Sequence, residues 1–155
     1  MTGYSRFLAM IVTSTVIMFG LMYLNTFAMD HVYFSETRAY MALYMGAVMA
    51  IVMLAFMWGM YKSTGINLLI LVVSALIFAG SLFLVRSQQT ITDVSWMKAM
   101  IPHHSIAILT SSRATITDPR VRELADGIIE TQRREIAEMQ RLIADLEGRA
   151  APATQ

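Results

Sequence analysis

The sequence contains no cysteine and only three prolines among its 155 residues. Without cysteine, the chain can form no disulfide, zinc–thiolate site, iron–sulfur cluster or cysteine nucleophile. Charge is also scarce, at 15% of residues, and the formal net charge is only +1. A protein that binds nucleic acid needs a basic surface, so this class is excluded. The sequence also lacks a glycine-rich phosphate loop and a dinucleotide fingerprint, which leaves no motif for a common catalytic site.

The few charges are unevenly distributed, because only five precede Arg86: Arg6, Asp30, Glu36, Arg38 and Lys62. Three uncharged stretches lie between them, Phe7–Met29, Ala39–Tyr61 and Ile66–Val85. Each reaches the ~20 residues that a helix needs to cross a bilayer. We therefore expect an all-α protein: a three-helix transmembrane domain at 1–88, a soluble helical domain at 89–148 and a flexible tail at 149–155.

This organisation makes the lipid bilayer a partner and excludes a free cytosolic enzyme. The first stretch is too long for the apolar part of a signal peptide, so we expect it to be retained. Basic residues near the spans give a slight excess on the side of Arg38, Arg86 and Lys98 over the side of Arg6 and Lys62. Taken alone, this count opposes a cytoplasmic N-terminus.

Methionine is abundant, with fourteen copies, and five recur every four residues in the second span: Met41, Met45, Met49, Met53 and Met57. Flexible methionines often fill gaps between helices. Thioethers also bind soft cations such as Cu(I), so Met41, Met45 and Met49 are possible accessory ligands. His31, beside Asp30, is another possible accessory ligand, although the segment also fits an interfacial turn. Small residues are expected to let the spans approach closely: Gly20, Gly46, Ala50 and Gly80.

The soluble part reads as two helices. Thr92 or Asp93 can cap the first, which is expected to end near Ala114. Asp118-Pro119 begins the second, which runs to about Leu146 before Gly148. Two short helices bury little core alone, so they need the membrane domain or a second copy. A homodimer would form a four-helix bundle.

One apolar stripe is expected to face inward on the second helix: Val121, Leu124, Ile128, Met139, Leu142 and Leu146. Gln132 and Glu135 fall near the centre of this stripe. A carboxylate on an apolar face is costly unless it is paired or binds a metal.

The first helix places matching groups on one side: Asp93, Met97, Met100, His104, Ala107 and Ser111. His103 lies at the edge of that side, because adjacent residues point about 100° apart. Histidine and methionine without cysteine favour copper, Cu(I) especially, while carboxylate and histidine also accept iron or zinc. The alternative is that the histidines pack in a bundle and hydrogen-bond to Glu135 or Gln132.

These two segments resemble a known family. The run from Met97 to Ala107 (MKAMIPHHSIA) and the run from Arg122 to Met139 (RELADGIIETQRREIAEM) are similar to the domain-of-unknown-function family 305. The resemblance implies a ferritin-like helical bundle and copper or silver binding in the periplasm. It implies that the following residues bind the ion: Met97, Met100, His103, His104 and Met139. Glu135 is implied as a ligand or as a support for the ligands, and Gln132 and Asp93 are expected in supporting positions.

We therefore expect a multi-pass protein of the bacterial inner membrane with a periplasmic, dimeric hairpin. Its function would be copper or silver sequestration or handover in metal homeostasis, with no catalytic residues and with a transfer partner that the sequence does not identify. Two alternatives remain open. One is a di-metal oxidoreductase of the ferritin-like type, and the other is a structural membrane subunit whose hairpin only dimerises.

Overall fold

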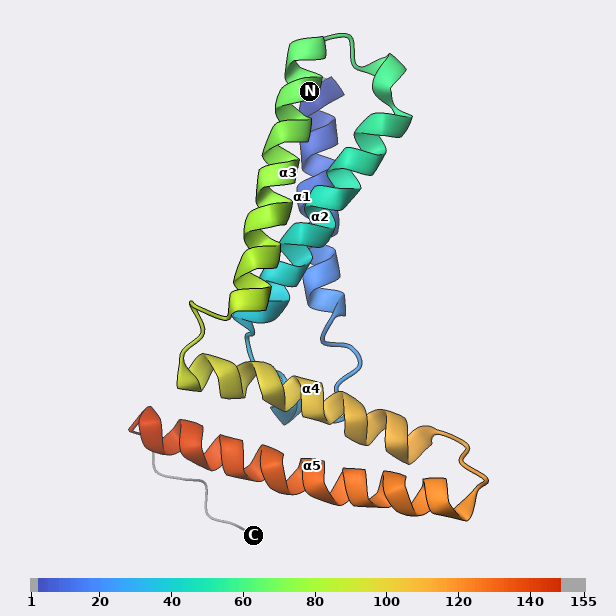
Figure 1. Cartoon of the computed structure of the whole chain (residues 1–155), viewed down its shortest axis with the longest axis vertical. Coiled ribbons are helices and arrows are strands. Elements are labelled where there is room, and N and C mark those ends of the chain that lie inside the picture. The colour runs from blue at the N-terminus through green and yellow to red at the C-terminus, as the bar shows by residue number, and fades with distance from the viewer. Residues whose placement is uncertain (1–2, 149–155) are drawn as a thin grey trace. The chain divides into compact units, whose positions relative to one another are not determined.

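The computed structural model describes residues 3–148, which form five α-helices, two short 3-10 helices and no strand. The expected all-α fold is therefore confirmed for this range (Figure 1). The chain divides into two compact units. One comprises the residues up to Met22 together with Thr37–Thr90, and the other comprises Tyr23–Glu36 and the residues from Ile91 onward. The predicted flexible tail, 149–155, lies outside the described residues.

The first unit contains the three apolar helices α1 (Gly3–Leu21), α2 (Glu36–Phe56) and α3 (Thr64–Ser87). All three are long and apolar enough to cross a membrane. Their common core is formed by Phe7, Ala50, Leu54 and Tyr61.

The ends of the first two helices differ from the prediction. Helix α1 stops at Leu21 instead of Met29, and α2 stops at Phe56, followed by the 3-10 helix η2 (Trp58–Met60). The apolar run after Leu21 does not continue the helix because Tyr23–Glu36 belongs to the second unit. Apolar composition alone could not reveal this, since the apolar helix α1 and the irregular segment after it share that composition.

The expected role of small residues holds at Gly46 and Ala50 and is wrong at Gly20 and Gly80. A Cβ atom at Gly46 would collide with the side chain of Thr15, so α1 and α2 approach closely there, and Ala50 is buried. At Gly20 and Gly80, by contrast, a Cβ would meet no described atom within 4 Å.

The second unit contains an antiparallel hairpin of α4 (Asp93–Arg113) and α5 (Pro119–Leu146), seen in Figure 1. The segment 23–36, with its 3-10 helix η1 (Met29–His31), also belongs to this unit. The Thr92 hydroxyl accepts a hydrogen bond from the Ser95 amide and so caps α4, as expected. Asp118 caps α5 by accepting from the Arg120 amide. The Arg120 guanidinium also donates to this carboxylate, and both bonds hold the pKa of Asp118 below its ordinary value. Gly148, with φ of 69°, follows the end of α5.

The core of the hairpin uses a different face of α5 from the predicted one. It consists of buried side chains from both helices: Met97, Ile101, Ile108, Ile136, Met139 and Ile143. Of the predicted inward stripe only Met139 is buried. The other five residues are exposed: Val121, Leu124, Ile128, Leu142 and Leu146. The apolar surface of α5 is wider than one partner helix can cover. The predicted stripe lies mostly on the part of this surface that α4 leaves exposed.

Candidate metal centre

Three methionine side chains contribute to the hairpin core. Met97 on α4 and Met139 on α5 are 5% and 6% exposed, and Met100 packs against the same cluster. These are the three methionines predicted as ligands. The structure therefore brings soft donors from both helices into one apolar environment, where cations of low charge and soft character are preferred over hard ones.

His104 joins the two helices beside this core. Its Nδ1 atom donates a hydrogen bond of 3.0 Å to the carbonyl oxygen of Met100, because a carbonyl can only accept. Its Nε2 atom lies 2.9 Å from Oε2 of Glu135 on α5. The His104 side chain is 13% exposed, whereas that of Glu135 is 42% exposed.

The hydrogen bond to the Met100 carbonyl orients the His104 ring. A histidine that binds a metal through one ring nitrogen commonly donates its other N–H to a carbonyl or carboxylate, which fixes the orientation of the ring. Here the carbonyl holds Nδ1, so Nε2 is the nitrogen that faces Glu135. Nε2 and the carboxylate oxygen together offer two donor atoms from two helices.

His103 lies apart from this arrangement. Its side chain is exposed, and its ring centroid is 6.4 Å from that of His104, with the two planes 64° apart. The predicted divergence of adjacent histidines is what the structure shows. Whether His103 shares an ion with His104 stays a prediction.

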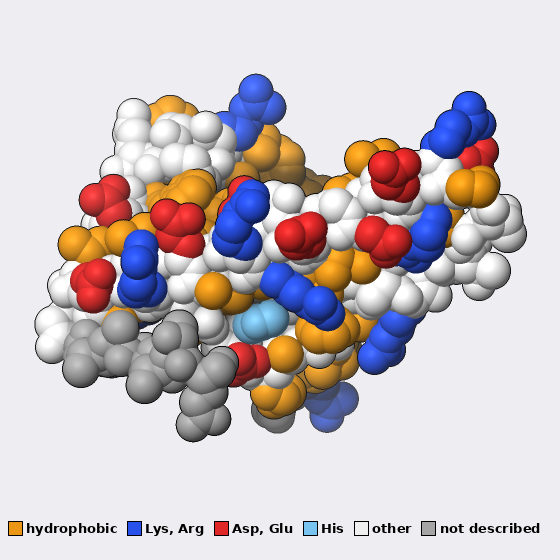
Figure 2. Space-filling model, turned by 90° about the horizontal axis from the view of Figure 1, so that it is seen from below, with side chains coloured by type: hydrophobic (Ala, Val, Ile, Leu, Met, Phe, Trp, Pro, Cys, Tyr) orange, Lys and Arg blue, Asp and Glu red, His pale blue; other side chains and the backbone are white. Residues whose placement is uncertain are grey.

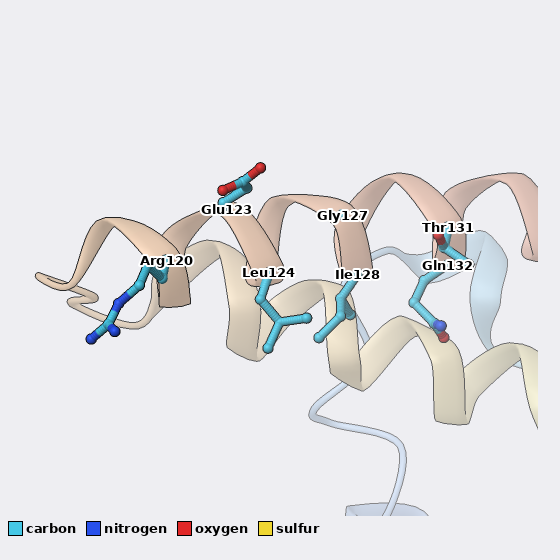
Figure 3. Close-up of a pocket in the computed structure, with 7 residues that line it drawn as sticks. All are labelled: Arg120, Glu123, Leu124, Gly127, Ile128, Thr131 and Gln132. Carbon is cyan, nitrogen blue, oxygen red and sulfur yellow. The ribbon is translucent and has the colours of Figure 1, made fainter.

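The two predicted supporting residues have different surroundings. Gln132 is half-buried and lines a shallow hollow of about 600 Å³ on α5, shown in Figure 3. In that view its side chain points to the same side of α5 as those of Leu124 and Ile128. Asp93 is exposed in the first turn of α4.

The possible accessory ligands lie elsewhere. His31 is hydrogen-bonded within the hairpin unit, with Nδ1 2.9 Å from the Ser105 hydroxyl and Nε2 3.9 Å from Asp30 Oδ1. Met41, Met45 and Met49 lie on α2 of the other unit and are half-buried. Further along α2, Met53 shares a hollow of about 390 Å³ with Met10, Thr13 and Ser14 of α1.

Sequence reasoning missed Ser105 and the segment that it holds. Ser105 is fully buried, and its hydroxyl accepts a 2.6 Å hydrogen bond from the Phe27 amide as well as contacting His31. A serine next to His104 carries little signal, because helical serines are usually exposed. Among residues 3–148, no group of three or more His, Asp or Glu side chains is arranged to hold a metal.

Residues 84–154 match the model of the family described as "Domain of unknown function (DUF305)", which confirms the resemblance expected from the two motifs. The chain is also 36% identical over 87 residues to "Uncharacterized protein L153" of Acanthamoeba polyphaga mimivirus. That alignment covers 54% of this chain and 57% of the viral protein. No solved structure matches the chain significantly. Neither description names a ligand, so the metal is a matter for proposal.

Proposed function

We propose that the chain is a membrane-anchored protein that binds copper(I) or silver(I) through its α4–α5 hairpin and serves metal sequestration or handover. The apolar helices α1, α2 and α3 would anchor the hairpin to a lipid bilayer. The proposed location is a bacterial inner membrane with the hairpin on the periplasmic side, and the motif resemblance supports this orientation. The basic residues around the spans favour the opposite orientation by a slight excess.

One observation carries the proposal. His104 Nε2 and Glu135 Oε2 face each other at 2.9 Å, with the ring oriented by the Met100 carbonyl, beside a core that contains the Met97 and Met139 thioethers. Nitrogen and thioether donors without thiolate suit Cu(I) and its soft analogue Ag(I). Iron and zinc, which prefer more nitrogen and oxygen ligands, fit this set less well.

The competing interpretation is a structural subunit whose hairpin binds no ion. It is supported by the same pair, because His104 and Glu135 already satisfy each other by hydrogen bonding. A di-metal oxidoreductase requires several inward carboxylates on facing helices. No observation on the described residues favours that enzyme over the other two functions.

The distinguishing experiment is a competition titration of the full chain in detergent, with Ag(I) or with Cu(I) under reducing conditions. We expect His104→Ala to weaken binding by at least about tenfold, since even residues that only support metal ligands contribute 10–100-fold. The matched control is His31→Ala, which removes a histidine of the same unit that contacts Ser105 instead of Glu135. Equal affinities for wild type and His104→Ala would contradict the proposal.

A further inference from the structure

The two sides of the hairpin are not equivalent. One side is covered by the chain itself, because the segment 23–36 packs there. On this side Ser105 binds the Phe27 amide and His31, and the Gln140 amide donates to the Asp30 carbonyl at 3.5 Å. The apolar core of the hairpin is therefore closed toward Ser105 and Gln140.

The opposite side, which we term the open flank, carries the five exposed residues of the predicted stripe of α5 together with Glu135: Val121, Leu124, Ile128, Glu135, Leu142 and Leu146. Val121, Ile128, Glu135 and Leu142 are seven residues apart, and at about 100° per residue this spacing keeps them on one side of the helix. Leu124 and Leu146 are 65% and 61% exposed. Glu135, the partner of His104, thus stands in the middle of an uncovered apolar stripe.

The order of residues along the open flank is self-complementary. Aliphatic side chains occupy both ends, and Thr131 and Glu135 make the middle polar. A partner that covers this flank must be apolar at its ends and polar at its centre. A second copy in antiparallel orientation meets that requirement by symmetry, as an isologous interface does.

Charge supports the antiparallel orientation. Arg120 and Asp145 lie on the same edge of the open flank at opposite ends of α5, and both are exposed. Within one chain, the Arg120 guanidinium pairs with the Asp118 carboxylate at 2.7 Å. Antiparallel pairing brings Asp145 of the second copy to this exposed ion pair at each end of the interface. Figure 2 shows that acidic and basic side chains are interspersed on the face of the molecule in view.

The available area is sufficient. From Val121 to Leu146 the flank is roughly 38 Å long at 1.5 Å per residue and about 10 Å wide. Helix α4, with 21 residues, adds a shorter strip, on which the half-buried Ala107 and Ser111 follow His104 by three and seven residues and leave room for a neighbouring helix. Together the two strips offer roughly 680 Å², which lies within the range of about 600–1,000 Å² that each partner buries in a stable interface.

We infer that two copies of the hairpin pair antiparallel through their open flanks and that this pairing completes the metal centre. The inference rests on the proposed function. A single hairpin leaves the Glu135 side chain 42% exposed to water. Pairing places the polar middle of the second copy, including its Gln132, over Glu135 and His104. These two side chains then lose their contact with solvent and gain the side-chain amide of Gln132 as a neighbour.

The absence of cysteine makes a clean test possible. In the full chain, a short bis-maleimide should cross-link Thr131→Cys of one copy to Thr131→Cys of the other. Residue 131 lies near the middle of the flank, so in an antiparallel pair its two copies lie close to the symmetry axis. The control is Glu130→Cys: Glu130 is exposed, whereas Thr131 is half-buried, and at about 100° per residue Glu130 points away from the flank. Antiparallel pairing further predicts that a chain with Leu124→Cys cross-links to a chain with Leu142→Cys, and that neither cross-links to itself.

The second experiment measures metal binding by the variant Leu124→Glu. Because Leu124 is exposed, we expect this variant to fold as the wild type does. Helical circular dichroism checks this. We expect Leu124→Glu to abolish the Thr131→Cys cross-link and to weaken Ag(I) binding by about tenfold or more. The His104→Ala variant should lose Ag(I) and keep the cross-link.

Two results would overturn the inference alone: a chain that binds Ag(I) without this cross-linking pattern, or a Leu124→Glu variant that loses the cross-link with unchanged Ag(I) affinity. A wild-type chain that cross-links but does not bind Ag(I) would overturn the proposed function, and with it the completion of a metal centre.

Discussion

At the scale of single residues, the sulfur atoms of Met97 and Met139 have two possible uses. Both side chains are buried in the hairpin core, where they pack against Ile136 and Ile143. Packing requires only a flexible apolar side chain of this volume, whereas metal binding requires the thioether itself. Substitution by leucine separates the two uses, because it keeps the volume and removes the sulfur.

We predict that Met97→Leu and Met139→Leu each change the free energy of unfolding by less than about 1.5 kcal/mol, as volume-conserving exchanges do. Both should weaken Ag(I) binding severalfold in the same titration. Met29→Leu is the control, since Met29 is 86% exposed and lies outside the core. Wild-type affinity in both core variants would show that the thioethers serve packing alone.

At the scale of elements, the contact between α1 and α2 depends on one glycine. Gly46 faces Thr15, whose hydroxyl already donates a 2.8 Å hydrogen bond to the Ile11 carbonyl. Thr15 therefore has little freedom to turn away from an added methyl group. Membrane helices generally use small residues at such contacts, because van der Waals packing drives their association.

We predict that Gly46→Ala destabilises the helical bundle by about 1–3 kcal/mol, the usual cost of overpacking. Adding Thr15→Ala should remove most of this cost, so the two substitutions are not additive. Gly20→Ala, where a Cβ has no described neighbour within 4 Å, serves as the control. Unfolding in detergent mixtures measures the wild type and all three variants, and equal effects at Gly46 and Gly20 would refute the close approach.

The elements also show what the sequence could predict. Caps and charge gave the hairpin within a residue or two: Thr92, Asp118 and Gly148 lie where expected. Periodicity gave the correct helices but the wrong inner face of α5. An amphipathic stripe reports apolar surface, and it cannot say whether the covering surface comes from the same chain. Glu135 was expected at the centre of that stripe, and the structure places it there, on the uncovered part.

At the scale of the whole molecule, a unit of three apolar helices and a hairpin unit share one chain, and their sequences interleave at 23–36. This segment connects two apolar helices in the sequence, yet its hydrogen bonds to Ser105 and Gln140 join it to the hairpin. Long-range pairing of this kind leaves no periodic signal, so it could not be predicted. The pairing of His104 with Glu135 rather than Gln132 was open for the same reason, since it depends on the rotation of two helices about their axes.

The central claim is that the hairpin binds a soft metal ion through His104 and its neighbours. Elemental analysis of the full chain, purified from cells grown with copper, tests it most directly, with the His104→Ala variant purified in parallel. We predict copper in the wild-type protein and at least about tenfold less in the variant. Equal copper contents, or a wild-type protein free of copper and silver after growth with either metal, would contradict the account.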